Sequence, residues 1–104
     1  MAQPKRARTL RRESARKEEG LARDRERLFL SEAGGSPEKP ISVDSAAVVE
    51  IRARGVRCPQ CGSEHTVAEH AAVSADAGRL REARLQCKQC GSRRSMWFRL
   101  PVLN

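Results

Sequence analysis

Aromatic residues are scarce in this chain, which has two Phe, one Trp and no Tyr among its 104 residues. Hydrophobic residues make up 38% and charged residues 33%. A chain of this size and composition cannot bury a large apolar core, and small domains of this kind depend on a disulfide or a metal ion. No apolar run approaches the roughly 18 residues of a membrane helix. No apolar segment typical of a secretion signal follows the basic N-terminus. We therefore expect a soluble, cytoplasmic, monomeric protein that does not contact a membrane.

The charge of the chain is strongly basic. Lys and Arg number 21 against 13 Asp and Glu, which gives a formal net charge of +8. Residues 1–30 carry +5 and residues 50–104 carry +5, separated by −2 over residues 31–49. Such an excess favours RNA or DNA as a partner. The alternative is a charged surface that only keeps the chain soluble.

The N-terminal stretch, residues 1–33, is a basic, Arg-rich and helix-prone extension. Leu10, Leu21 and Leu28 fall on one side of a helix with 3.6 residues per turn, but their spacing does not fit a coiled coil. This stretch predicts either a frayed helix or disordered tail, or a helix that becomes ordered on a nucleic acid or protein partner.

A linker is expected over residues 34–49, because Gly34-Gly35 and two following prolines end any helix. Ile41 and Val43 alternate with polar residues, as in a short edge strand. The β-branched residues that follow Ala46 favour extended structure packed on the C-terminal domain.

Residues 50–104 are expected to form one small β domain. Thr66–Val73 and Arg79–Gln86 have lengths suited to a hairpin around a turn at Ser74–Gly78. Arg93–Leu100 predicts a third strand, with Met96 and Phe98 on one face and Trp97 on the other.

All four cysteines lie in two copies of one pattern, CPQCG and CKQCG, and 25 residues lie between Cys61 and Cys87. Two residues between cysteines allow one tight turn to direct both sulfurs at a single ion, and four thiolates are typical of structural zinc. Two disulfides would suit an oxidising compartment, a redox pair needs a βαβ setting, and iron also accepts four thiolates. His65 is a further candidate ligand. We predict one structural Zn²⁺ held by Cys58, Cys61, Cys87 and Cys90.

Residues 57–100 resemble the zinc-ribbon family, through the two CxxCG knuckles and the expected strands. The resemblance implies a three-stranded antiparallel zinc ribbon, so the predicted fold is a small metal-stapled β domain with a charged helical or disordered N-terminal extension. Ribbons commonly serve transcription and translation machinery as nucleic-acid or protein docking modules. Some ribbons that stimulate transcript cleavage carry an Asp-Glu pair at the hairpin tip. Here the tip offers only Asp76, which gives no grounds for that activity.

The pattern does not favour an enzyme, because four thiolates leave no open position on the metal and no other catalytic constellation is present. Two functions remain. The first is nucleic-acid binding through a sheet that joins arginines to a stacking tryptophan. Its candidate residues are Arg79, Arg81, Arg84, Arg93, Arg94, Trp97 and Arg99. The second is a protein adaptor that docks on a larger complex through the ribbon and the N-terminal leucines.

Overall fold

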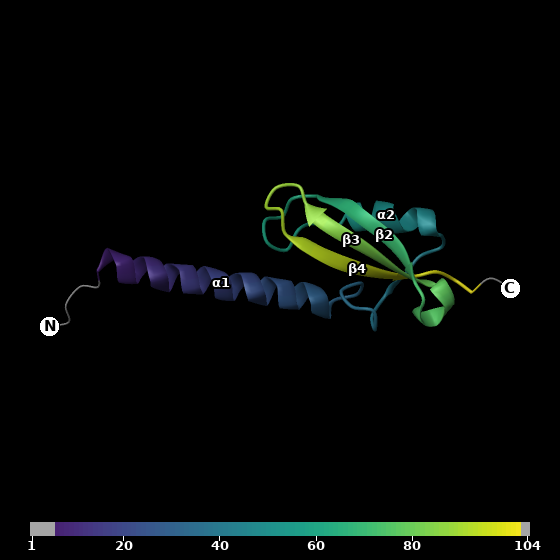
Figure 1. Ribbon diagram of the computed structural model, residues 1–104, viewed down its shortest axis with the longest axis horizontal. Coiled ribbons are helices and arrows are strands. Elements are labelled where there is room, and N and C mark those ends of the chain that lie inside the picture. Colours follow the sequence, from purple (N-terminus) through teal and green to yellow (C-terminus); the bar gives the residue numbers. More distant parts are fainter. Residues whose placement is uncertain (1–5, 103–104) are drawn as a thin grey trace.

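A computed structural model describes residues 6–102 of the chain; residues 1–5 of the expected N-terminal extension and 103–104 of the expected ribbon domain lie outside the described residues. The element order is α1 (Ala7–Ser31), β1 (Ile41–Ser42), α2 (Ala46–Arg54), β2 (His65–Val73), a 3₁₀ turn η1 (Ala75–Gly78), β3 (Leu80–Cys87) and β4 (Arg93–Arg99). The strands form one sheet in the order β1-β4-β3-β2, and Figure 1 shows the three long strands of this sheet. Within residues 6–102, no helix is both long and apolar enough to cross a membrane.

The three long strands pair antiparallel, β2 with β3 and β3 with β4, close to the bounds expected from the sequence. The sheet nevertheless differs from the expected three-stranded antiparallel ribbon, because the short β1 adds a fourth strand parallel to β4. Beyond β1, the amide of Val43 donates to the carbonyl of Arg99 at 3.0 Å. The result is a four-stranded mixed sheet.

The extended structure expected after Ala46 is wrong: Ala46–Arg54 is the helix α2. Val49 and Ala53, four residues apart on this helix, are both fully buried against the sheet. The burial of this i, i+4 pair outweighs the weak preference of β-branched residues for strands. Packing on the domain was expected, but the local conformation was not. The domain boundary expected at residue 50 therefore falls inside a helix.

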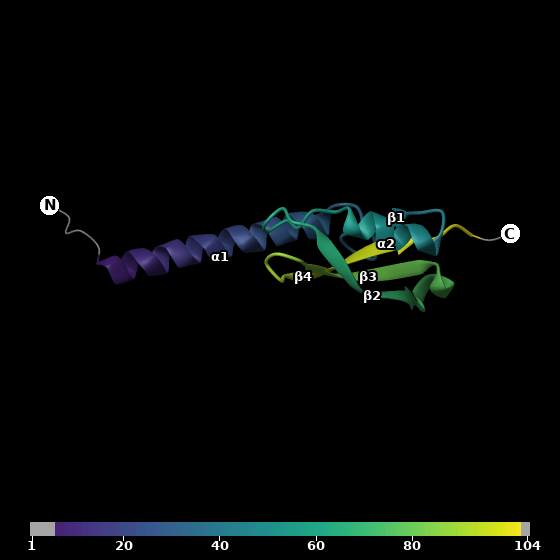
Figure 2. The ribbon, with the colours of Figure 1, turned by 90° about the horizontal axis from the view of Figure 1, so that it is seen from above.

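One face of the sheet carries the core, and both helices lie on that side of it (Figure 2). The buried cluster comprises Val43, Val49, Ala53, Ala83, Leu85, Met96 and Phe98. Phe29 from the end of α1 also packs against this cluster. The opposite face of the sheet is not covered by either helix (Figure 2).

The N-terminal stretch forms a continuous helix of 25 residues, α1, which extends far beyond the sheet (Figure 1). The molecule is consequently elongated, with principal extents of 75 × 24 × 17 Å. Leu10, Leu21 and Leu28 are 52%, 48% and 62% exposed, so the leucine side of α1 does not pack on the domain. The helix is instead fixed near its C-terminal end by contacts at the cysteine cluster.

Candidate metal centre

Two matching turns position the four cysteines. In the first, the amide of Gly62 donates to the carbonyl of Cys58 and the amide of Cys58 to Ser63. In the second turn, the amide of Gly91 donates to the carbonyl of Cys87 and the amide of Cys87 to the carbonyl of Ser92. Gly62 and Gly91 have φ angles of 77° and 75°, a left-handed conformation that favours glycine. The glycine that follows each pair is therefore what closes each turn.

The turns bring all four sulfur atoms within 4.8 Å of one another. The sulfurs of Cys58 and Cys90 are 3.7 Å apart, and those of Cys61 and Cys87 are 3.3 Å apart. A tetrahedral ion with metal–sulfur bonds of about 2.3 Å requires sulfurs about 3.8 Å apart, so the spacing suits one ion. None of the four forms a disulfide. The cysteines are positioned to bind a metal ion.

The surroundings favour ionised sulfur. The amides of Gln60 and Gln89 point at the sulfurs of Cys58 and Cys87, each at 3.4 Å. Burial raises the pKa of the Cys58 thiol, but hydrogen bonds from Ser92 and from backbone amides outweigh burial and lower this pKa to about 5. A thiolate is the form that binds a metal. Thiolates this close together repel one another, and a divalent cation relieves that repulsion.

Arg94 on β4 lies behind the first knuckle, with its side chain only 1% exposed. Nη1 donates to the sulfur of Cys58 at 3.4 Å and also to His65 Nε2. Nη2 donates to Ser92 Oγ at 2.8 Å, and Nε and Nη2 hold both carboxylate oxygens of Glu26 at 3.1 and 3.0 Å. Every N–H donor of the guanidinium thus has an acceptor, as a buried charge requires.

Glu26 belongs to α1, so Arg94 joins this helix directly to the metal centre. Burial raises the pKa of Glu26, but hydrogen bonds from Arg94 and Gln60 and the charge of Arg94 bring it below its usual value. Gln60, inside the first knuckle, also donates to the carbonyl of Ala22 at 2.8 Å. The ring of Phe29 lies 5.7 Å from the guanidinium of Arg94, within cation–π range. These contacts form the α1 dock, which we define as Ala22, Glu26, Phe29, Gln60 and Arg94.

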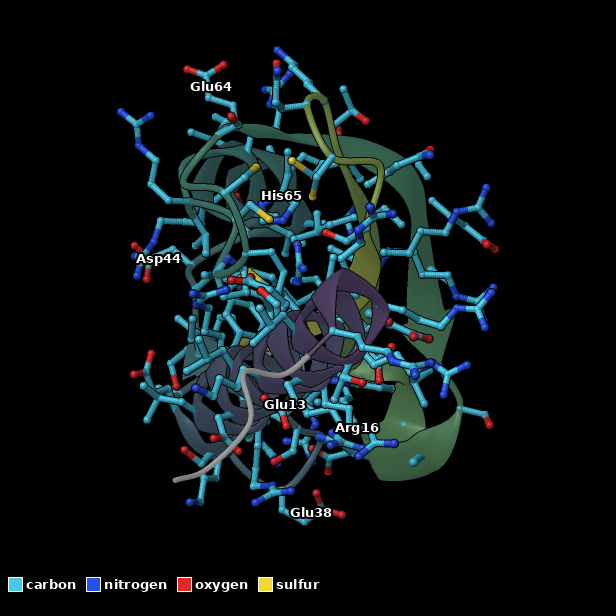
Figure 3. The ribbon with its side chains drawn as sticks, turned by 90° about the vertical axis from the view of Figure 1, so that its left-hand side faces the viewer. Glu13, Arg16, Glu38, Asp44, Glu64 and His65 are labelled. Carbon is cyan, nitrogen blue, oxygen red and sulfur yellow. The ribbon has the colours of Figure 1, made fainter. Side chains whose placement is uncertain are left out.

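His65 is not placed as a metal ligand. It is 1% exposed and close to the sulfurs (Figure 3), but both ring nitrogens have other partners. Nδ1 is 2.8 Å from the carbonyl of Val56, and Nε2 faces Arg94. Arginine only donates hydrogen bonds, so Nε2 accepts and Nδ1 carries the proton. His65 therefore supports Arg94 and leaves the four cysteines as the ligand set.

The structure divides the seven residues expected to bind nucleic acid. The register pairs Arg84 with Ser95 and Glu82 with Trp97. Since Met96 and Phe98 are buried on the covered face, Arg84, Arg93, Trp97 and Arg99 share the open face. Arg81 pairs with Phe98 in the register, and it shares the covered face with Arg94; Arg79 precedes β3.

Carboxylates of the chain hold several of these arginines. Asp76 binds both Arg79 and Arg99, and Glu69 binds Arg84 at 3.1 Å. Arg94 is committed to Glu26. The sheet is therefore less basic than the sequence alone suggests, and Arg94 does not belong to an exposed patch. Trp97, partly buried, is tied to the linker through its amide, which donates to Gly34 at 2.8 Å.

Sequence reasoning missed the supporting role of Glu26, Gln60, Ser92 and Arg94. One signal was present: Arg94 alternates with Met96 and Phe98, so a strand over these residues places it on the apolar face. For Glu26 no local pattern was available, because its partner is 68 residues away.

Comparison of the chain with models of known families, with curated proteins and with solved structures finds no match.

Proposed function

We propose that this chain is a non-enzymatic nucleic-acid-binding protein of the cytoplasm, with one structural zinc ion in a ribbon-like domain. Four thiolates within 4.8 Å of one another suit zinc and would complete its coordination, which leaves no position for a substrate. Zinc bound in this way stabilises folding directly, and at comparable sites it contributes about 10–16 kcal/mol. This contribution compensates for a small core. Cysteines arranged around one ion, and not paired as disulfides, fit a reducing compartment.

The observation that carries nucleic-acid binding is the charge on the distal half of α1, which we define as residues 6–17 so that it includes the N-cap Arg6. This segment holds six basic residues and one acidic residue, for a net +5. Residues 18–32 hold three basic and five acidic residues, for a net −2. The basic charge of α1 is thus concentrated in the part that extends away from the domain (Figure 1). Exposed arginines gathered on one projecting element are suited to phosphates.

The open face of the sheet supports the same function. Arg93 is exposed there and shares this face with the partly buried Trp97, which lies four residues, or about 13 Å, further along the same strand. An aromatic ring and a cation on one face of a sheet are able to contact the same strand of nucleic acid, the ring by stacking on an unpaired base and the cation by binding a phosphate. We assign the sheet a secondary role, because Arg84 and Arg99 already bind carboxylates of the chain.

A protein adaptor is the second candidate, and the exposed leucines favour it. Leu10, Leu21 and Leu28 lie along one side of α1 and are about half exposed or more. Apolar side chains aligned on a helix are suited to the groove of a partner protein. In this alternative the arginines provide solubility and steering.

Fluorescence anisotropy of the zinc-loaded full chain with short DNA and RNA, titrated across salt, separates the two candidates. We expect affinity to fall steeply with salt, because each phosphate contact releases counterions. The variant Leu10→Gln/Leu21→Gln/Leu28→Gln should bind like wild type. If no nucleic acid binds even at low salt, nucleic-acid binding is wrong. The adaptor alternative is then preferred.

A further inference from the structure

We propose that the distal half of α1 binds in the major groove of duplex DNA, while the α1 dock holds the other end of the helix on the metal domain. This inference rests on the proposed nucleic-acid binding and specifies both the surface and the form of nucleic acid. Its starting point is that the dock holds α1 through Ala22, Glu26 and Phe29, which all belong to the C-terminal half of the helix. About 22 Å of helix therefore lies beyond the dock, at about 1.5 Å per residue.

The directions of the arginines suit a groove. With about 100° between successive residues, Arg8, Arg11, Arg12 and Arg16 span an arc of about 140° around α1. An arc this wide reaches a groove floor and both walls, whereas a helix lying on a flat surface uses a narrower stripe. By the same geometry Arg16 lies at one limit of this arc, and Figure 3, viewed from the N-terminal side, shows Arg16 directed away from His65 and the cysteine sulfurs. The centre of the arc lies on the side of α1 that carries Glu26.

The side chains between and behind the arginines agree with this placement. Ala15 projects near the middle of the arc, and its small side chain allows the helix backbone to approach the bases closely. Leu10 projects from the opposite side, together with Leu21 and Leu28, and would face away from the DNA. The basic stretch ends where Glu18 and Glu19 begin the acidic part of α1. The contact is thus limited to residues 6–17, about 18 Å.

The dimensions favour DNA over RNA. A helix with its side chains is about 10–12 Å across, and the major groove of B-form DNA is about 12 Å wide. The major groove of A-form RNA is deep and too narrow for side chains to read. About 18 Å of helix covers roughly five base pairs. Arginine is also the residue that most often contacts guanine in the major groove.

The test uses the zinc-loaded full chain and a short DNA duplex, with an RNA duplex of the same sequence and the single DNA strand as comparisons. The double variant Arg8→Gln/Arg12→Gln removes two charges from the arc. Its matched control, Arg52→Gln/Arg54→Gln, removes two exposed charges from α2. We expect the arc variant to lower the salt slope by about 1.8 and the affinity at 0.1 M salt by about 60-fold. The control should change both far less.

Dimethyl sulfate reports the groove, because it methylates guanine N7 in the major groove and adenine N3 in the minor groove. Bound protein should protect guanine N7, and the arc variant should lose that protection. Protection of adenine N3 instead, equal effects of the two double variants, or tighter binding of the RNA duplex or single strand would overturn the inference while leaving nucleic-acid binding in place. Failure to bind any of the three probes would instead refute the proposed function itself.

Discussion

Replacing Glu26 by Gln tests whether the α1 dock holds the helix on the metal domain. The substitution keeps the size of the side chain but removes the charge, and it leaves one Arg94 donor facing an amide instead of a carboxylate oxygen. The two hydrogen bonds from Arg94 to Glu26 are short, 3.1 and 3.0 Å. The side chain of Arg94 is 1% exposed and that of Glu26 is 31% exposed. Exposed ion pairs contribute about 0.2–1 kcal/mol. Breaking fully buried pairs costs about 3–5 kcal/mol. We expect about 2 kcal/mol for this half-buried arrangement.

Hydrogen exchange of the α1 amides measures this loss. The helix has a glycine at its centre and is marginal by itself, so releasing the dock should open its C-terminal half. A loss of about 2 kcal/mol corresponds to roughly 30-fold faster exchange between residues 21 and 31, while the strand amides keep their protection. The matched control is Glu18→Gln, an exposed position on the same helix with the same change in charge. If these amides exchange at the same rate in Glu26→Gln and Glu18→Gln, then the ion pair of Glu26 with Arg94 does not hold α1 on the metal domain.

Three further outcomes follow from the site. Chelation of the metal should abolish cooperative unfolding of the β domain, followed by circular dichroism, because the metal contributes about 10–16 kcal/mol; retained cooperativity would contradict this. Gly62→Ala and Gly91→Ala should each lower the free energy of unfolding by about 1–2 kcal/mol. Both glycines have a positive φ angle, and no atom lies within 4 Å of an added Cβ, so the cost comes from the backbone conformation and not from a clash. Gly20→Ala should instead stabilise α1 by about 1 kcal/mol, because alanine favours a helix more than glycine does. Burial raises the pKa of Glu26, but its contact with Arg94 outweighs burial and lowers this pKa in the folded protein. Docking of α1 should therefore persist above about pH 4.3, the value for an unfolded chain, and should be lost as the pH falls through the lower pKa of Glu26 in the folded protein. In Glu26→Gln, hydrogen exchange of the α1 amides should not show this dependence on acid pH.

The ligand cluster and the three long strands were predictable because their signals are local. The spacing within each knuckle and the glycine after it specify the turns, and alternation specifies the faces of β4. The helix α2 was mispredicted because its conformation depends on burying Val49 and Ala53 against strands that occur later in the sequence. The short strand β1 was expected at an edge, but its parallel pairing with β4 was not. That pairing depends on the path of the linker.

The docking of α1 was not predictable from local pattern, because its contacts join residues far apart in the chain. Glu26 has no neighbour in the sequence that distinguishes it from the exposed Glu18 and Glu19. Arg94 was grouped with nearby arginines because composition suggested a basic patch. Its alternation with Met96 and Phe98 argued for burial, and a buried arginine requires an acidic partner. That requirement points to a carboxylate elsewhere in the chain, although it does not identify which one.

Joining a helix to a sheet through a buried arginine costs free energy, because the guanidinium must lose its hydration. Well-packed apolar residues of similar volume often stabilise a protein as much as a buried ion pair or more, so stability alone does not account for Arg94. The guanidinium contributes directional hydrogen bonds, which an apolar contact lacks. It binds Cys58, His65, Ser92 and Glu26 through donors in a fixed plane, and so couples the orientation of α1 to the cysteine cluster. An apolar contact would hold the helix but would let it slide or rotate. For a helix proposed to present an arc of arginines to one groove, a fixed rotation about its axis is what binding requires.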